Sequence, residues 1–219
     1  MMIEAINIRK QYGELEVLKG INLKIEKSEI LSITGSSGAG KTTLLQILGS
    51  LDKSTSGQVL IGNTDINKLS NNDLAKFRNQ HIGFVFQFHH LLPEFTAIEN
   101  VCIPAFIAGK SKKEAELQAT KLIEYMGLRD RISHKPTELS GGEQQRIAIA
   151  RALINQPDVI FADEPSGNLD ASKSEELHDL FFQLRDEFKQ TYVIVTHNKE
   201  LAERADRQII IKDGCILNS

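Results

Sequence analysis

One octapeptide constrains the fold of this chain more than any other part of its sequence. Residues 35–42 read Gly-Ser-Ser-Gly-Ala-Gly-Lys-Thr, which fits the pattern G-x-x-x-x-G-K-[ST]. An apolar run at 30–33 precedes it, and apolar residues at helical spacing follow over 42–51. A strand, a glycine-rich turn and a helix in this order form a loop whose backbone N–H groups face an anion. The sequence therefore predicts an α/β fold built around a phosphate site.

The residues of this loop have distinct chemical roles. Glycines let the backbone wrap closely around phosphate oxygens, because they adopt conformations that other residues avoid. Lys41 is expected to reach the β- and γ-phosphates, and Thr42 is expected to ligate Mg²⁺. A merely flexible Gly/Ser loop is the alternative, which the flanking strand and helix disfavour. The expected nucleotide contacts are Gly35, Ser36, Ser37, Gly38, Ala39, Gly40, Lys41, Thr42 and Thr43.

Two carboxylates follow a second apolar run. Residues 159–162 read Val-Ile-Phe-Ala, as in a parallel strand with both faces buried, and Asp163 and Glu164 come next. Ligands of open α/β sheets bind at the carboxyl ends of the strands. We expect Asp163 to hold Mg²⁺ through water, and Glu164 to polarise a water molecule for in-line attack. The alternative is an exposed acidic turn before Pro165, which has no connection to a phosphate loop.

A six-residue string predicts a second anion site. Ser140 and Glu143 have the spacing of a capping box at a helix start. That interpretation leaves the paired glycines Gly141 and Gly142 unexplained, since glycines weaken a helix and are tolerated where a backbone must approach another group. Bare helix N–H groups beside a serine hydroxyl can hold an anion. The full string is Leu139, Ser140, Gly141, Gly142, Glu143 and Gln144.

Other short patterns extend the expected architecture. Residues 82–86 and 192–195 are further candidates for parallel strands, whereas 3–8 and 21–25 alternate in polarity and suit an antiparallel edge. Apolar spacing predicts a helix over 177–188, with Ser172 and Glu175 as its capping box. We expect one domain over residues 1–219, with a helical subdomain inserted at about residues 88–156, where no convincing strand is found.

Composition excludes several classes of protein. Lys and Arg total 26 and Asp and Glu total 29, so the formal net charge is −3 and no basic surface for nucleic acid is expected. Two cysteines without metal-binding spacing are expected to be idle or buried thiols. No run approaches 18 apolar residues, and the first residues lack the apolar core of a secretory signal. We therefore expect a cytoplasmic chain that does not span a membrane.

These motifs together resemble the nucleotide-binding subunits of ABC transporters, and the resemblance covers essentially the whole chain. It implies a P-loop NTPase core with a mainly parallel sheet, an antiparallel β subdomain and an inserted α-helical subdomain. It also implies hydrolysis of ATP with Mg²⁺, and two partners: integral membrane subunits and a second copy of the chain. In that family the string at 139–144 completes the nucleotide pocket of the second copy, which accounts for two anion sites in one chain.

The resemblance assigns roles to further residues. Gln87 resembles the glutamine that touches Mg²⁺ and senses the γ-phosphate, and His197 resembles the switch histidine that contacts the γ-phosphate. Tyr12 resembles the aromatic residue that stacks on adenine, with Val17 against the same ring; a core tyrosine is the alternative. The segment that crosses the dimer interface, here called the D-loop, corresponds to Asn168, Leu169 and Asp170.

Two positions depart from the commonest family pattern. Asn198 follows the switch histidine where Asp is commoner, and Ser166 stands where Thr is commoner. Both replacements keep a hydrogen-bonding side chain, so hydrolysis is still expected.

A string after Gln87, Phe-His-His-Leu-Leu-Pro at 88–93, resembles the lipoprotein-releasing branch of the family. It implies a peripheral ATPase on the cytoplasmic face of the inner membrane that powers lipoprotein release toward the outer membrane. The macrolide-export and cell-division branches are the alternatives. The apolar residues of this loop either dock a partner's helix or pack within the subdomain, and His89 and His90 have no third ligand at a metal-binding spacing.

Two other classes of function are less consistent with the sequence. A soluble ABC ATPase acting on DNA or ribosomes would need a long coiled-coil insertion or a second nucleotide domain, and neither is present. A small-molecule phosphotransferase would leave residues 139–144 without a role.

Overall fold

The larger of two β-sheets runs through the middle of the molecule. A computed structural model describes residues 1–217. Its six-stranded sheet has the order β10-β9-β3-β8-β7-β6, and all neighbours are parallel except the β9–β10 pair. The predicted mainly parallel sheet is therefore confirmed. The strands are β3 (Ile30–Thr34), β6 (Ile82–Phe86), β7 (Val159–Asp163), β8 (Thr191–Val195), β9 (Arg207–Lys212) and β10 (Cys215–Ile216).

Both faces of this sheet are buried, which explains its unbroken apolar runs. Along β7, Val159 and Phe161 pack into one core, and Ile160 and Ala162 pack into the other. Successive side chains of a strand point to opposite faces, so a strand covered on both sides needs no polar residue. The sheet thus separates two hydrophobic cores.

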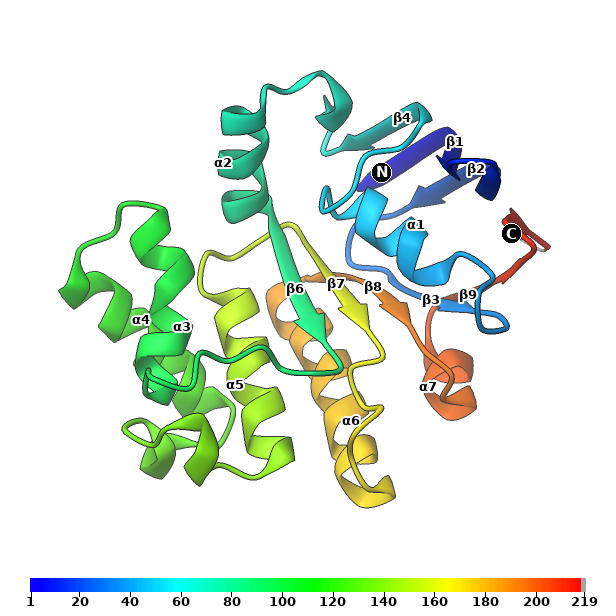
Figure 1. Cartoon of the computed structure of the whole chain (residues 1–219). Helices are drawn as coiled ribbons and strands as arrows, with labels where there is room; N and C mark the ends of the chain where they lie inside the picture. The colour runs from blue at the N-terminus through cyan, green and yellow to red at the C-terminus, as the bar shows by residue number, and fades with distance from the viewer. Residues whose placement is uncertain (218–219) are drawn as a thin grey trace.

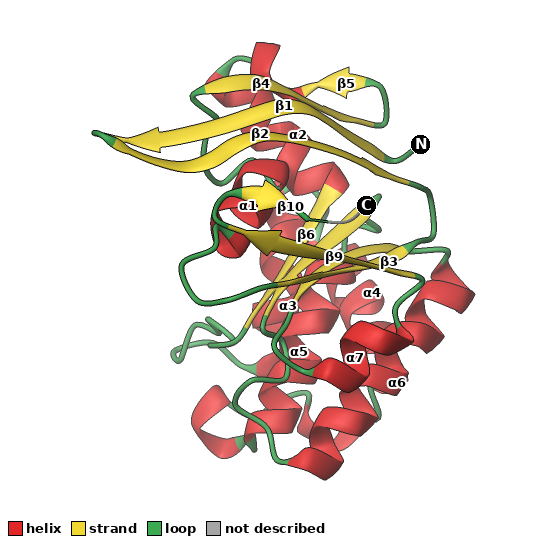
Figure 2. Ribbon diagram, turned by 90° about the vertical axis from the view of Figure 1, so that its right-hand side faces the viewer, coloured by secondary structure: helices red, strands yellow, loops and turns green. Residues whose placement is uncertain are grey.

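The predicted antiparallel sheet covers the first core. Its order is β2-β1-β4-β5, and helix α1 (Lys41–Leu48) packs in the core between the two sheets. Figure 2 shows the three levels, with the antiparallel sheet above the parallel sheet and most helices below. The strands are β1 (Ile3–Tyr12), β2 (Leu15–Ile25), β4 (Ser56–Ile61) and β5 (Thr64–Asp65).

Helices cover the other face of the parallel sheet. In Figure 1, α3 and α4 lie to one side, with α5 and α6 beside the strands. Residues 88–156 contain helices and no strand, as predicted, but their buried residues share the second core with the sheet. Their status as a separate subdomain stays a prediction. The helices are α2 (Asn71–His81), α3 (Ala97–Ile107), α4 (Lys112–Tyr125), α5 (Gly141–Leu153), α6 (Ala171–Phe188) and α7 (Lys199–Arg204), with short 3-10 turns at Ile66–Lys68, Arg129–Arg131 and Pro136–Glu138.

The capping box predicted at Ser172 and Glu175 is wrong. Helix α6 begins two residues earlier, because Asp170 has extended backbone angles and its carboxylate accepts a hydrogen bond from Lys173 N at 3.0 Å. Aspartate is among the best N-cap residues, so Asp170 outcompetes Ser172 for the helix start. Within residues 1–217, no helix is both long enough and apolar enough to cross a bilayer.

Candidate nucleotide-binding and hydrolysis site

The turn between β3 and α1 has the shape of a phosphate-binding loop. Gly35 has φ +144° and Gly40 has φ +103°, a region that side chains rarely adopt. A Cβ on Gly35 would lie 2.1 Å from the carbonyl oxygen of Ile211, and one on Gly40 would lie 2.8 Å from Leu18. Strand β9 and strand β2 therefore press on the loop from two sides, and only glycine fits at these two positions.

Lys41 lies inside this loop. Its side chain is buried, and Nζ donates to the carbonyl oxygens of Gly35 and Ser36, both at 2.9 Å. Two backbone carbonyl groups therefore hold the ammonium group over the turn. A phosphate oxygen that enters the loop can replace these carbonyl partners, and the charge on both sides strengthens such a hydrogen bond.

Thr42 and Asp163 meet at the carboxyl edge of the sheet. Thr42 Oγ1 donates to Asp163 Oδ1 at 3.3 Å, which joins the start of α1 to the end of β7. Burial raises the pKa of the Asp163 carboxyl, while Thr42 and the charge of Lys41 lower it in part. A hydroxyl and a carboxylate oxygen at this separation are hard donors of the kind that Mg²⁺ prefers. The residues present therefore fit the expected magnesium site.

A second carboxylate at the carboxyl edge of the sheet, that of Glu164, contacts His197. His197 N donates to Glu164 Oε2 at 3.1 Å, and His197 Nε2 lies 3.2 Å from Glu164 Oε1. Burial raises the pKa of the Glu164 carboxyl, and the backbone N–H and charge of His197 offset part of that rise. The ends of β7 and β8 thus hold a partly desolvated carboxylate beside the histidine.

Gln87 lies with the D-loop. Its side-chain Nε2 donates to Asn168 Oδ1 at 2.9 Å, and Asn168 Nδ2 donates back to the Gln87 carbonyl oxygen at 3.0 Å. No polar contact among residues 1–217 joins Gln87 to Thr42 or Asp163. The structure therefore brings two of the three expected magnesium residues together, and couples the third to the predicted dimer interface.

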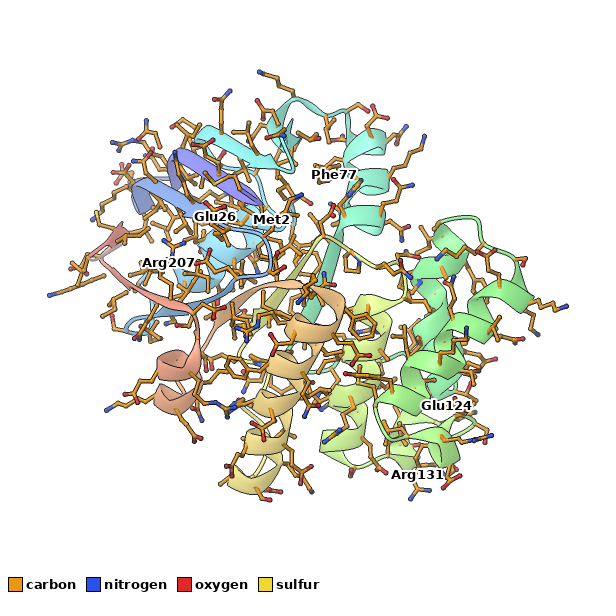
Figure 3. The ribbon with its side chains drawn as sticks, turned by 180° about the vertical axis from the view of Figure 1, so that it is seen from behind. Met2, Glu26, Phe77, Glu124, Arg131 and Arg207 are labelled. Atoms are coloured by element: carbon orange, nitrogen blue, oxygen red, sulfur yellow. The ribbon has the colours of Figure 1, made fainter. Side chains whose placement is uncertain are left out.

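The string at 139–144 starts helix α5 and forms a capping box. Ser140 Oγ accepts from Glu143 N at 3.3 Å, and Glu143 Oε2 accepts from Ser140 N at 2.7 Å. Arg131 donates to Glu143 at 3.0 Å, and Figure 3 places Arg131 at this end of the molecule. Gly141 stays exposed. Figures 1 and 2 show that the start of α5 lies well away from α1, so the two anion sites of one chain do not face each other.

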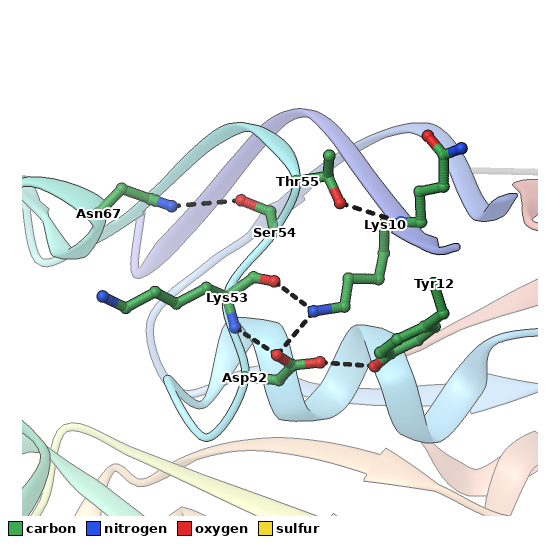
Figure 4. A network of polar contacts seen from close by, with 8 residues as sticks. Lys10, Tyr12, Asp52, Lys53, Ser54, Thr55 and Asn67 are labelled. Atoms are coloured by element: carbon green, nitrogen blue, oxygen red, sulfur yellow. Dashed lines mark hydrogen bonds and ion pairs between the residues drawn. The ribbon is translucent and has the colours of Figure 1, made fainter. Parts of the chain in front are cut away.

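Tyr12 is exposed at the end of β1, so the alternative of a core tyrosine is wrong. Its hydroxyl donates to Asp52 Oδ2 at 2.6 Å, and Lys10 Nζ lies 4.6 Å from the ring centre while donating to Asp52 Oδ1 at 2.7 Å (Figure 4). The ring is half exposed and fixed in place, as a stacking platform must be. Val17 lies beside Gly40 of the phosphate loop.

The structure identifies supporting residues that the sequence did not reveal. Gln145 is fully buried and donates to the Phe86 carbonyl oxygen at 3.3 Å. Arg151 donates to the carbonyl oxygens of His90 and His89 at 2.7 and 2.8 Å. These partners are about 60 residues away in the chain, so no local pattern could have found them. Asn198 is the N-cap of α7, which gives the less common residue after His197 a structural role.

Comparison with known proteins decides the family. Residues 18–167 of this chain match the sequence family described as ABC transporter. The chain belongs to the ABC transporter family. Two curated ABC relatives are the lipoprotein-releasing system ATP-binding proteins LolD of Porphyromonas gingivalis, 59% identical over 100% of both chains, and of Bacteroides thetaiotaomicron, 60% identical over 98% of this chain and 99% of that one.

Solved ABC structures agree with the fold. The dimeric ATP-binding cassette MJ0796 bound to ADP and Pi, in a post-hydrolysis state, is 41% identical and superimposes with a TM-score of 0.90 over 99% of this chain and 97% of that chain. A bacterial structure, cbiO1 of Clostridium perfringens, is 27% identical with the same TM-score and covers 99% of this chain and 87% of that chain. The predicted ABC ATPase fold is confirmed.

Proposed function

We propose that this chain is the ATP-hydrolysing subunit of an ABC transporter that releases lipoproteins from the inner membrane toward the outer membrane. The support for the cargo is the near-full-length identity of 59–60% to curated lipoprotein-releasing ATP-binding proteins. The support for the chemistry is one observation, the meeting of Thr42, Asp163, Glu164 and His197 at the carboxyl edge of β7 and β8.

Hydrolysis proceeds by in-line attack of a water molecule on the γ-phosphate. Glu164 orients and deprotonates that water, because burial raises the pKa of its carboxyl toward the range of a useful general base. His197 holds Glu164 and donates toward the γ-phosphate oxygens. Lys41 and the N–H groups of the loop stabilise the charge that builds on the transferred group.

Magnesium is proposed at Thr42 and Asp163, with Gln87 joining when the D-loop moves. Mg²⁺ bound there would neutralise negative charge on the β- and γ-phosphates. Thr42 would offer its hydroxyl oxygen and Asp163 a carboxylate oxygen, the pair that lie 3.3 Å apart. Gln87 would have to give up its hydrogen bond to Asn168, so ligation by Gln87 and the position of the D-loop are linked.

A second copy of the chain completes each nucleotide site. The phosphate loop of one copy binds ATP, and the helix start at Ser140–Gly142 of the other copy binds the same γ-phosphate from the opposite side. A two-fold interface repeats this arrangement, so two ATP molecules are enclosed. Tyr12 stacks on the adenine at the open side of each pocket, with Val17 against the same ring.

A groove beside β6 is proposed as the dock for the membrane subunit. It encloses about 400 Å³ between α2, β6, α3 and the end of α5, and it is lined by Phe84, Phe86, Ile107, Arg78 and Arg151, among others. Ile107 is 71% exposed, and Phe88, two residues after the lining residue Phe86 in sequence, is 67% exposed. Apolar walls beside two arginines suit an amphipathic helix with an acidic residue.

The groove and Gln87 are adjacent in sequence. Phe86 lines the groove, and Gln87 bonds to Asn168 of the D-loop. Gln145 and Arg151 hold the backbone around these residues from α5. A partner that moves in the groove therefore moves Gln87 and the D-loop together. The chain is proposed to act on the cytoplasmic face of the inner membrane.

The cargo is tested by purifying tagged E164Q protein from native membranes with ATP and identifying its partners by mass spectrometry. Few-span membrane proteins with a large periplasmic domain, together with trapped lipoproteins, are the expected partners. Wild-type protein purified without nucleotide is the control. A different membrane partner without lipoproteins would overturn the cargo while leaving the ATPase assignment intact.

A further inference from the structure

A histidine that the proposed chemistry does not use lies behind the catalytic carboxylate. His178 of α6 is 1% exposed, and its Nε2 lies 3.0 Å from Ser166 Oγ, two residues after Glu164. Ser166 is itself buried, at 7% exposed. This pair therefore joins the long helix α6 to the segment that leads from Glu164 into the D-loop.

The segment from Glu164 to Leu169 is unusual backbone that needs support. Glu164 has φ +47°, a conformation that is unfavourable for a residue with a side chain and persists only where its surroundings enforce it. Two tight turns follow, in which Gly167 N donates to the Glu164 carbonyl oxygen at 3.0 Å and Leu169 N donates to that of Ser166 at 3.1 Å. Ser166 lies at the junction of these turns.

The hydrogen-bond pattern identifies the form of His178. Its other ring nitrogen, Nδ1, is buried without a partner among residues 1–217. A buried N–H without an acceptor is costly, so the proton belongs on Nε2 and is donated to Ser166 Oγ. Burial also lowers the pKa of His178, which keeps the ring neutral and Nδ1 bare.

Charged groups around the pair do not offer a competing partner. Asp179 pairs with Arg204 at 2.6 Å, and Glu200 and Glu175 line the same hollow of about 330 Å³ as His178 and Glu164. The nearest strand end supplies Thr196 and His197. Within the described part of the chain, the His178 ring makes one hydrogen bond, which is the one to Ser166.

We propose that His178 is a positioning residue for hydrolysis: its hydrogen bond to Ser166 holds the strained Glu164 and the D-loop in their working geometry. The proposal rests on the role proposed above for Glu164. In this account His178 touches neither nucleotide nor water. It fixes the segment that carries the general base at one end and the D-loop residue Asn168 at the other.

The test is ATP turnover of H178F, S166A, the double variant and H178Q, measured over a range of ATP concentrations. H178F and S166A are expected to lower kcat about 3- to 10-fold with KM for ATP unchanged, the loss that one neutral hydrogen bond can produce. The double variant is expected to be no worse than either single variant, since both remove the same bond. H178Q is expected to regain most of kcat, because its amide can donate to Ser166.

Two controls separate positioning from general loss of stability. L184A removes a fully buried side chain of the same helix and lowers stability, but its kcat per folded molecule is expected to match the wild type. E164Q tests the proposed function independently. If E164Q is inactive but H178F keeps the full kcat, the positioning role of His178 is overturned while the role of Glu164 stands. Additive losses of kcat in the double variant would also overturn the positioning role. So would an H178F variant that is as active as H178Q.

Discussion

Glu164 combines a strained backbone with a desolvated carboxylate at the end of β7. Its φ of +47° turns the chain sharply after Asp163, so two successive carboxylates serve different groups. Asp163 faces Thr42, whereas Glu164 faces His197. The expected metal ligand and the expected base are therefore consecutive residues.

Replacing Glu164 with glutamine is expected to reduce ATP turnover by about 10²–10⁴-fold, since an amide cannot accept the proton of the attacking water. Nucleotide binding is expected to persist, because the amide keeps the size of the side chain. Phosphate release and ATP binding are measured on the same preparation. Turnover near the wild-type rate would refute the role of Glu164.

Activity is expected to fall on acidification earlier than an ordinary glutamate would predict. Burial raises the pKa of the Glu164 carboxyl, and a protonated carboxyl cannot act as a base. As pH falls through that raised pKa, kcat declines, whereas an exposed glutamate would retain its charge down to about pH 4.3. The check is a kcat profile from pH 8 down to about pH 4 at saturating ATP, over the range where the wild type stays folded. A decline that begins no earlier than that expected for an exposed glutamate would contradict the raised pKa.

Glycine at position 35 is a requirement of packing. G35A is expected to destabilise the fold by at least about 2 kcal/mol, because its Cβ would lie 2.1 Å from the Ile211 carbonyl oxygen at φ +144°. The matched control is G38A, at φ +76° with open space around the added Cβ, which is expected to lose only about 1 kcal/mol. Urea unfolding measures both, and equal losses would contradict the packing argument.

Helix α6 connects the hydrolysis site to the interior of the molecule. The D-loop residue Asp170 caps its first turn. Farther along the helix, Ser174 and His178 contact Ser166. Beyond them, Phe181 and Leu184 are buried in the second core. Ser174 Oγ also approaches the Ser166 carbonyl oxygen at 3.5 Å. Movement of the D-loop is thus resisted by one long, well-packed element.

The buried His178 gives the fold a pH dependence that can be measured. Burial lowers the pKa of His178 in the folded chain below its ordinary value near 6.5, so below that pH the unfolded chain binds the proton more readily. Stability contributed by His178 is therefore fully present above pH 6.5 and is lost as pH falls toward the lowered pKa. The free energy of unfolding of H178F is expected to fall less than that of the wild type between pH 7 and pH 5. Parallel pH curves would contradict a neutral buried histidine.

Sequence patterns predicted the elements that are buried on two faces and missed those held by tertiary contacts. Strand β7 is apolar from Val159 to Ala162, and strand β8 is apolar from Tyr192 to Val195, so both are recognisable from the sequence. Strand β9 buries only Ile209 and Ile211 and has polar residues at both of its ends, and helix α2 buries only Leu74, so neither has a strong local signal. The same limit applied to the site, where motifs located the loop, Asp163 and His197 but gave no sign of the partners Asp52, Arg151 and His178.

At the scale of the whole molecule, the phosphate loop and the start of α5 point to two copies acting together. Each chain carries both proposed halves of a nucleotide site at separate places (Figure 1). The exposed Gly141 and the D-loop residue Asn168 stay at the surface, as an interface between copies requires. Mutations in the two halves can therefore be combined in a mixed dimer so that one site is inactivated and the other stays intact.

Mixing two inactive variants is expected to restore activity. K41A removes the lysine of the loop, and G141E places a carboxylate at the second anion site, where the added Cβ would meet nothing closer than Leu169 at 3.8 Å. A mixed dimer has one site with both defects and one intact site, so an equimolar mixture is expected to recover about a quarter of the wild-type turnover. Each variant alone is the control. No recovery on mixing would argue against a shared site.

The central claim is that ATP is enclosed between two copies of this chain and that Glu164 opens the pair by hydrolysis. The most direct test is the sedimentation mass of E164Q with and without ATP and Mg²⁺. We predict a 24.4 kDa monomer without nucleotide and a species of about twice that mass with ATP, containing two uncleaved nucleotides. A monomer that binds ATP without dimerising would contradict it.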